Sequence, residues 1–413
     1  MADPPRTATE RLTPYQRKLL VFLSVATFFE GYDFIALTQI LPSLARDFAL
    51  PKEGPGVLLG VINLGAVLAF LVVRLADRLG RRRVMMITIA GYTLFTFASA
   101  FAPNAVTFGA AQLCARVFLL AEYALSMVYA AEEFPAARRG FVMGVIQGFS
   151  TLGAIVCAGL VPRFLAMPWG WRGVYVAGTL PLLLLAWWRR GLRETQRFQA
   201  HAAPRDGGFT RVLTGPYRGR VLLMAAIWGL TFMCTQVTVA FWKLFAVTER
   251  GLDDAQVARS IVIAALVSAP GVFAVGRLLD RGRRQSAVIL FTAAAASTLA
   301  CYTLHGVWPL TLALTLGIFA QSAVLPLLSA YTAELFPTDL RADAYAWANN
   351  LLGRIAYVLA PVLVGALAGR VGYGPAVAST AIFPMCALVL VLWKLPETRG
   401  RELEETSALD AAH

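Results

Sequence analysis

Glu30 and Asp33 lie three residues apart in the sequence FFEGYDF, inside a long apolar segment. On a helix, residues with this spacing are separated by about 60° and share one face. An ionised carboxylate at the centre of an apolar span costs about 2.5 to 3.5 kcal/mol, so such an acid faces a wet cavity, contacts a cation or is protonated. Because burial and a neighbouring negative charge both favour the protonated carboxyl, this pair could carry a proton reversibly. A static ion-pair network that fixes helix packing is the alternative.

The elements that must position this pair are long apolar helices. Of the 413 residues, 58% are hydrophobic and 15% are charged, and the mean hydropathy is +0.64. These values predict a polytopic, all-α membrane protein rather than a soluble domain. A spanning helix needs about 20 mostly apolar residues. Twelve such segments are present, at 19–41, 56–76, 84–101, 106–129, 140–162, 173–190, 221–246, 257–279, 286–304, 308–331, 342–368 and 374–394.

Basic residues are distributed unevenly along the chain, whose net charge is +13. Lys and Arg are concentrated in the N-terminal segment and in the loops after even-numbered helices, which predicts that both termini are cytoplasmic. The N-terminal sequence MADPPRTATERLTPYQRK lacks the apolar core and cleavage site of a removable signal, so we expect the first helix to be retained. We therefore expect a multi-pass protein of the cell membrane, in the inner membrane if the source is a bacterium, with no nucleic-acid partner.

The remaining reactive side chains suggest neither a cofactor nor an enzyme. The three histidines lie in a loop, near a helix end and at the terminus, which leaves carboxylates as the candidate proton carriers within the membrane. No acid cluster suited to a metal, no activated nucleophile and no phosphate-binding Gly-rich loop is visible in the sequence, so we expect gradient-driven transport. The cysteines all fall in apolar spans without paired spacing and predict no disulfide or metal site: Cys114, Cys157, Cys234, Cys301 and Cys386.

The two halves of the sequence repeat each other. AEEFPAARRG at 131–140 matches AELFPTDLRA at 333–342, and DRLGRRR from Asp77 returns as DRGRR from Asp280, one residue shorter. Such a repeat predicts two six-helix bundles related by an axis along the membrane normal. We expect these bundles at 1–190 and 221–413, the second with a cytoplasmic tail, joined by a cytoplasmic loop at 191–220.

The sequence VRLADRLGRR, at 73–82, resembles the Gly-x-x-x-Asp-Arg-x-Gly-Arg-Arg loop motif of the major facilitator superfamily, with Val73 in place of the first glycine. The sequences ETQRF, at 194–198, and PETRG, at 396–400, lie where related families carry similar motifs. The resemblance covers the whole chain and implies alternating access, with a gate of charged residues that forms and breaks in each cycle. The alternative is that the arginines only enforce orientation. The implied gate residues are Asp77, Arg78, Arg81, Arg82, Glu132, Arg139, Asp280, Arg281, Glu334 and Arg341.

A narrower resemblance concerns the helices that carry the acids. FEGYD resembles the Asp-Gly-x-Asp segment of aromatic acid:proton symporters, with Glu30 at the first Asp, and Arg116 falls where those proteins have an arginine. GRIAYVLAP, at 353–361, resembles the helix-eleven signature of that branch and of organic-anion carriers. The resemblance implies that Asp33 and Glu30 handle the proton and that Arg116 and Arg354 bind a carboxylate, which suits the planar fork of a guanidinium. For Arg354, the alternative is an arginine that snorkels to the membrane interface or stabilises the seam between helices.

Other polar residues in the spans are secondary candidates. Glu122, where the resembling symporters have small residues, is a second possible proton or cation site, and Lys243 is either an outer-gate residue or a snorkelling lysine. The residues expected to offer neutral hydrogen bonds to a substrate are Tyr345, Asn349, Asn350 and Gln236.

We therefore predict a proton-coupled symporter of a small organic anion, such as an aromatic acid, that works as a monomer. Proton-coupled export of drugs or organic cations is the alternative, with Glu30, Asp33 and Glu122 binding the cation. Sugar uptake fits less well, because helix seven has Gln236 alone rather than a Gln pair followed by Asn. The substrate, the transport direction and the choice between protons and sodium stay open at this stage.

Overall fold

The computed structural model describes residues 12–134, 136–188, 211–337 and 340–399. Within these residues every regular element is a helix, and there is no strand. Ten helices in the described part of the chain are long and apolar enough to cross a membrane. Helices α6 and α11 lie at the two remaining predicted spans, which completes the predicted set of twelve.

The first half of the chain forms six long helices with well-defined starts. Thr13 caps the first helix by accepting a hydrogen bond from the Gln16 amide, and Asn104 caps the fourth by accepting one from the Thr107 amide. Gly80, which separates the second and third helices, has a φ of 94°, a region that favours glycine. The helices are α1 (Pro14–Asp47), α2 (Gly54–Leu79), α3 (Arg81–Ala100), α4 (Ala105–Glu133), α5 (Ala136–Leu165) and α6 (Gly170–Trp188).

The second half contains three interrupted spans that the apolar pattern does not predict. The helix expected at 221–246 breaks at Phe241, and the one expected at 342–368 contains a π-helical segment. The helix expected at 374–394 contains a 3-10 turn at Ser379–Ala381. Short π-helical segments are frequent at functional sites. The elements are α8 (Arg211–Thr214), α9 (Arg218–Ala240), α10 (Trp242–Thr248), α11 (Asp254–Leu279), α12 (Arg283–Thr303), α13 (Val307–Glu334), α14 (Arg341–Tyr345), η2 (Ala346–Gly353), α15 (Arg354–Val371), α16 (Tyr373–Ala378), η3 (Ser379–Ala381) and α17 (Ile382–Lys394).

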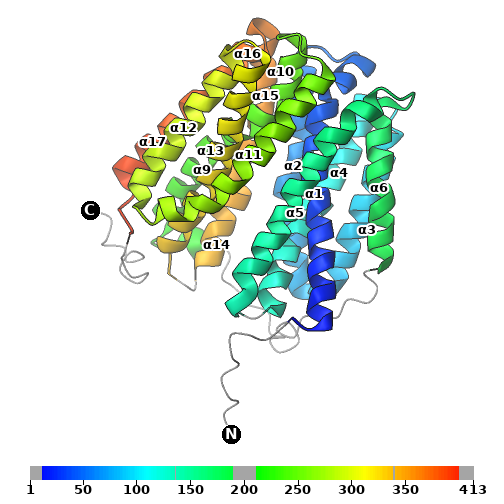
Figure 1. Ribbon diagram of the computed structural model, residues 1–413. Helices are drawn as coiled ribbons and strands as arrows, with labels where there is room; N and C mark the ends of the chain where they lie inside the picture. The colour runs from blue at the N-terminus through cyan, green and yellow to red at the C-terminus, as the bar shows by residue number, and fades with distance from the viewer. Residues whose placement is uncertain (1–11, 135, 189–210, 338–339, 400–413) are drawn as a thin grey trace.

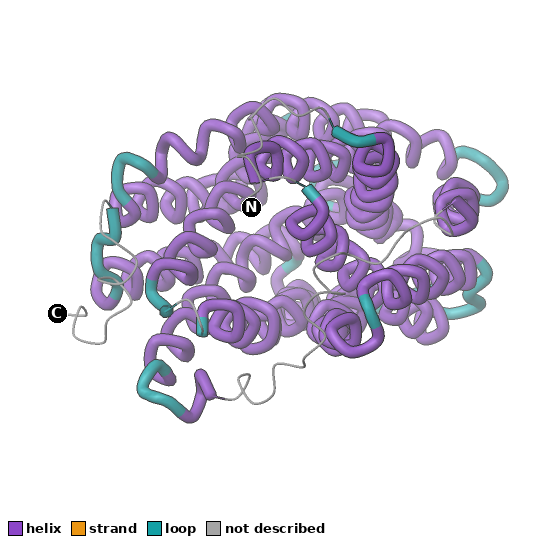
Figure 2. The backbone as a smooth tube through the Cα atoms, turned by 90° about the horizontal axis from the view of Figure 1, so that it is seen from below, coloured by secondary structure: helices purple, strands orange, loops and turns teal. Residues whose placement is uncertain are grey.

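The helices pack into two groups that follow the order of the chain. In the first group α1 packs on α5, and α4 packs on α2 and α3; in the second, α13 packs on α11 and α12, and α9 packs on α15. Figure 1 shows these groups side by side, and Figure 2 looks along the helix axes. This is the predicted all-α fold of two six-helix bundles. The exact bundle limits stay a prediction, since residues 191–210 of the expected linker lie outside the described set.

The two groups meet closely at one end of the molecule. We call the end where α1 begins and α17 ends the terminal end, and the opposite one the distal end. At the distal end α2 contacts α15, where a Cβ on Gly56 would lie 2.7 Å from the Gly365 Cα. The Tyr373 hydroxyl donates to the Lys52 carbonyl at 2.5 Å, and α10 packs on α1. These contacts join the two bundles at the distal end.

Candidate functional site

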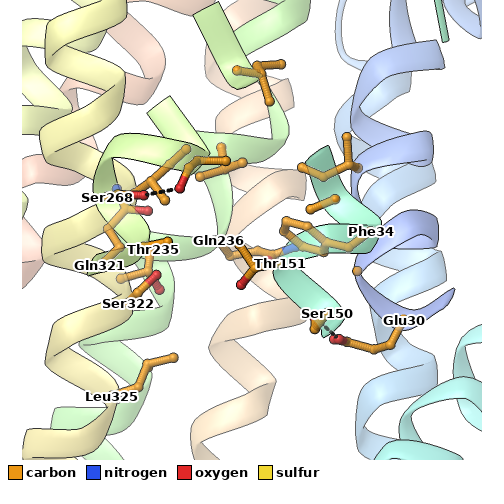
Figure 3. Close-up of a pocket in the computed structure, with 18 of the residues that line it drawn as sticks. Glu30, Phe34, Ser150, Thr151, Thr235, Gln236, Ser268, Gln321, Ser322 and Leu325 are labelled. Carbon is orange, nitrogen blue, oxygen red and sulfur yellow. Dashed lines mark hydrogen bonds between the residues drawn. The ribbon is translucent and has the colours of Figure 1, made fainter. Parts of the chain in front are cut away.

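A cavity of about 340 Å³ lies between the two groups of helices. Its walls come from α1 and α5 of the first group and from α9, α11, α13 and α15 of the second. Aromatic side chains on its walls are Phe34, Phe232 and Tyr357. A cavity of this size, mostly apolar with a few polar groups, is typical of a small-molecule site. The polar side chains that line it are Glu30, Ser150, Thr151, Thr235, Gln236, Ser268, Gln321 and Ser322 (Figure 3).

Two glycines bring Glu30 to the cavity by letting α1 and α5 approach closely. A Cβ on Gly31 would lie 1.9 Å from the Ser150 carbonyl oxygen, and a Cβ on Gly153 would lie 1.9 Å from the Phe28 carbonyl oxygen. Each helix therefore needs a glycine at its contact point. The approach places the Ser150 hydroxyl against the Glu30 carboxylate, to which it donates at 2.6 Å (Figure 3).

Asp33 lies behind the cavity wall, one helical turn beyond Glu30. Its side chain is 3% exposed, and its Oδ2 lies 3.9 Å from Nη2 of Arg116, which is 6% exposed. The predicted meeting of helices one and four thus brings Asp33 and Arg116 together. Arg116 contacts the acid rather than the cavity, and its Nε has no hydrogen-bond partner.

Arg354 lies at the edge of the cavity, beside two aromatic rings that line it. Its guanidinium carbon is 5.5 Å from the centre of the Tyr357 ring and 6.0 Å from that of Phe232. The buried Nε of Arg354 has no hydrogen-bond partner. Arg116, Asp33 and Arg354 all act electrostatically on the Glu30 carboxylate. The site therefore combines two acids with two arginines.

The π-helical segment positions the neutral residues next to Arg354. Gly353, at its end, lets this helix approach α9, because a Cβ there would lie 2.9 Å from the Trp228 Cβ. Asn349 is buried with an unpartnered Oδ1, and Asn350 is half-buried. The Tyr345 hydroxyl lies 3.4 Å from Ser329 Oγ. Of the predicted neutral ligands, Gln236 lines the cavity. Tyr345 on α14 and Asn349 and Asn350 on η2 come just before Arg354 in the chain and are not among the residues that line it.

Gln321 on α13 is a cavity residue that the sequence reasoning missed. Its side chain is 5% exposed, and neither its amide nitrogen nor its amide oxygen has a hydrogen-bond partner. A glutamine in the middle of the span at 308–331 was a usable signal, because polar residues in membrane helices tend to face the protein interior.

Glu122 and Lys243 lie away from this cavity. The buried Glu122 carboxylate accepts a hydrogen bond from Thr88, so it lies between α3 and α4. Lys243 is buried on α10, and its Nζ lies 2.5 Å from Asp254 Oδ1 on α11. Their proposed roles as a second proton site and an outer gate stay predictions.

The predicted gate residues gather at the terminal end in two matching pairs. Arg81 Nη2 lies 3.4 Å from Glu132 Oε1, and Arg283 Nη2 lies 2.8 Å from Glu334 Oε1. Both pairs join equivalent positions of the sequence repeat. Asp280 and Arg281, the residues predicted for the second half, have exposed side chains, and Arg283 contacts Glu334. The one-residue deletion in the repeat explains the different register.

Three further gate candidates have side chains in the described part of the chain. Arg78 and Arg82 have exposed side chains, and Arg341 donates to the Phe336 carbonyl at 3.4 Å. The side chains of Asp77 and Arg139 lie outside the described set, as does the segment 194–198.

The PETRG segment reinforces the second pair. Glu397 accepts hydrogen bonds from the backbone amides of Arg283, at 2.8 Å, and Arg284, at 2.9 Å. The Thr398 hydroxyl donates to Glu334 at 2.6 Å. Burial works to raise the pKa of Glu397, but its hydrogen bonds from backbone amides outweigh this effect and leave the pKa below its usual value of 4.5.

Comparison with known proteins agrees with this architecture. The chain is 26% identical to the "Probable 4-methylmuconolactone transporter" of Cupriavidus pinatubonensis, covering 97% of this chain and 95% of that protein. It is also 26% identical to the gallate transporter of Pseudomonas putida, with 86% of each chain covered. An inward-open structure of the Escherichia coli xylose transporter XylE shares the fold, with a TM-score of 0.74, 18% identity, and coverage of 95% of this chain and 99% of that one.

The Major Facilitator Superfamily matches the sequence over residues 23–360 and 282–410. The two helical bundles, the cavity between them and the repeated pairs at the terminal end agree with this match. The chain is a multi-pass membrane transporter and not an enzyme, and it belongs to the Major Facilitator Superfamily.

Proposed function

We propose that this transporter moves a small organic anion, of the aromatic carboxylic acid class, together with a proton. The observation that carries the proposal is the charge balance of the site. Glu30 and Asp33 carry two negative charges, and Arg116 and Arg354 carry two positive charges. The cluster is therefore neutral when all four side chains are ionised. An organic anion adds one negative charge, and one proton on an acid restores neutrality.

This balance makes the two binding events cooperative. An uncompensated charge in a low-dielectric site costs several kcal/mol, so the bound anion and the bound proton each favour the other. Binding linkage is reciprocal: a substrate that promotes protonation is itself bound more tightly by the protonated protein. We assign the transported proton to Asp33, whose proton affinity Glu30 adjusts. We assign binding of the substrate carboxylate to Arg354. Arg116 acts on Asp33 in this scheme.

The relatives support the substrate class. One of them is named for gallate, which is an aromatic carboxylate, and another for 4-methylmuconolactone. The aromatic rings of Phe34, Phe232 and Tyr357 on the cavity walls suit a planar ligand. We place the terminal end in the cytoplasm of a bacterial cell, on the distribution of basic residues. The contacts at the distal end would then close the outer side in this conformation.

Proteoliposomes containing the purified protein and a pH-sensitive dye test the proposal. Added 4-hydroxybenzoate should enter and acidify the interior faster than in protein-free vesicles, and an imposed proton gradient should drive its accumulation. A sodium gradient of the same size should not. Accumulation driven only by sodium would refute proton coupling. Proton movement with tetraphenylphosphonium but not with the acid would favour organic-cation export instead.

A further inference from the structure

We propose that Gln321 forms the centre of a second subsite, which binds a hydroxyl group on the substrate. The transported acids would then be hydroxylated aromatic acids rather than simple ones. This inference rests on the proposed function, since it names the substrate class of the same cavity.

The first observation is the unsatisfied amide of Gln321. The side chain is 5% exposed and lines the cavity, yet both its polar atoms lack a hydrogen-bond partner. A buried polar group without a partner costs about 1 to 3 kcal/mol. A substrate group that satisfies this amide would recover that cost, whereas an apolar substrate would not.

The second observation is the hydrogen-bonding state of the neighbouring hydroxyls. Thr235 donates its hydroxyl proton to the Thr231 carbonyl at 3.1 Å, and Ser268 donates to the Ala265 carbonyl at 3.3 Å. Their oxygens keep lone pairs and therefore act as acceptors toward the cavity. The Gln321 amide nitrogen supplies donors. A phenolic hydroxyl both donates and accepts, so it matches this set of groups.

The third observation is the position of this subsite relative to the acids. Figure 3 shows Gln321, Ser322, Ser268 and Thr235 on one side of the cavity and Glu30 on the other. Gln321 carries no charge, which suits a neutral substituent better than a carboxylate. The substrate carboxylate binds Arg354 at the edge of the cavity. The substrate therefore carries two different polar groups, a carboxylate and a hydroxyl, on one ring.

Isothermal titration in detergent tests this inference with benzoate, 4-hydroxybenzoate and 3,4,5-trihydroxybenzoate. The wild-type protein should bind at least one hydroxylated acid about tenfold more tightly than benzoate, the effect of one satisfied buried amide. Gln321→Leu should remove this preference and leave the Kd for benzoate within about threefold of the wild-type value. Gln321→Met, which keeps the unbranched shape, should behave in the same way and covers the case in which the leucine variant folds poorly.

Gln39→Leu is the matched control. Gln39 on α1 is also fully buried with both amide atoms unpartnered, but it does not line the cavity. This variant should keep the wild-type preference for hydroxylated acids.

Four results would overturn the inference. Equal wild-type affinity for benzoate and both hydroxylated acids would remove the hydroxyl subsite and leave the proposed function standing. The same holds if both Gln321 variants keep the preference, or if the Gln39 variant loses it equally. If the wild-type protein binds none of the acids, the proposed function fails and the subsite fails with it.

Discussion

The first half of the chain supplies the carboxylate of the central cavity, whereas the second half supplies most of its neutral hydrogen-bonding groups. Glu30 and Ser150 come from α1 and α5, and the buried Asp33–Arg116 pair stands behind them. Gln236 and Gln321 come from α9 and α13 of the second half. The two halves thus share one fold but place different side chains in the cavity.

The terminal end shows the opposite relation between the halves. Arg81–Glu132 and Arg283–Glu334 occupy equivalent positions, and both join a residue at the start of one helix to a residue at the end of another. The second pair has the shorter contact and the added support of Glu397 and Thr398. The two halves therefore contribute different chemical groups to the cavity, whereas the terminal pairs retain the symmetry of the repeat. The first bundle handles the proton in this account, and the second selects the anion.

Asp33→Asn should have the largest effect, because an amide cannot cycle a proton. Accumulation of 4-hydroxybenzoate against its gradient should be abolished in proteoliposomes, while exchange at equal concentrations survives. Glu30→Gln should be milder. Asp47→Asn is the control, since Asp47 lies at the distal end of α1 against Arg172. Full proton-driven accumulation by the Asp33→Asn variant would show that the proton binds elsewhere. A stronger effect of Glu30→Gln would show that Glu30, not Asp33, is the proton carrier.

Arg354→Lys tests whether the second half of the chain binds the substrate carboxylate. Lysine keeps the charge but loses the planar fork, so a bidentate carboxylate contact should be lost. Hydrogen bonds to charged groups contribute about 1.5 to 3 kcal/mol, which corresponds to a roughly tenfold to hundredfold weaker Kd. The Arg354→Ala variant should bind the acid more weakly still. Equilibrium binding of the acid and of its neutral methyl ester measures this effect. Equal binding of acid and ester, or unchanged binding of the acid by both variants, would make Arg354 a packing residue.

The terminal pairs should differ in how much stability they provide. Arg283→Ala removes a close, partly buried contact with Glu334 and should cost about 1.5 to 3 kcal/mol. Arg81→Ala removes a longer contact, at 3.4 Å, between side chains of similar burial, and should cost less, about 0.5 to 1.5 kcal/mol. Thermal unfolding of both variants in one detergent compares them. Equal losses would show that the second half is not the more firmly fixed one at this end.

Glu397→Gln should have the smallest effect and should depend on pH. Because hydrogen bonding holds the pKa of Glu397 below 4.5, its ionised form stabilises the fold above that value, and this contribution is lost as pH falls through the lowered pKa. The difference in Tm between wild type and variant should therefore be full near neutral pH and shrink below about pH 4.5. A difference that stays constant from neutral pH to pH 4 would mean that the charge of Glu397 contributes nothing.

The sequence predicts the spans well because membrane thickness sets their length and burial sets their composition. The repeat likewise predicts that Glu132 and Glu334 are equivalent. The break at Phe241 and the π-helical segment were not predicted, because they depend on contacts between helices far apart in the sequence, such as Gly353 with Trp228. The unpartnered amide of Gln321 is equally invisible without the packing around it.

The most direct test measures the proton:acid stoichiometry and the acid affinity of Asp33→Asn and Arg354→Lys in the same proteoliposome preparation. We expect the Asp33→Asn variant to bind 4-hydroxybenzoate and exchange it but to take up no proton with it. The Arg354→Lys variant should need a higher concentration of acid to reach half-maximal transport. At saturation it should still carry the wild-type number of protons per acid. If both variants lose affinity and proton uptake in parallel, one shared site performs both tasks and the division between the two halves is wrong.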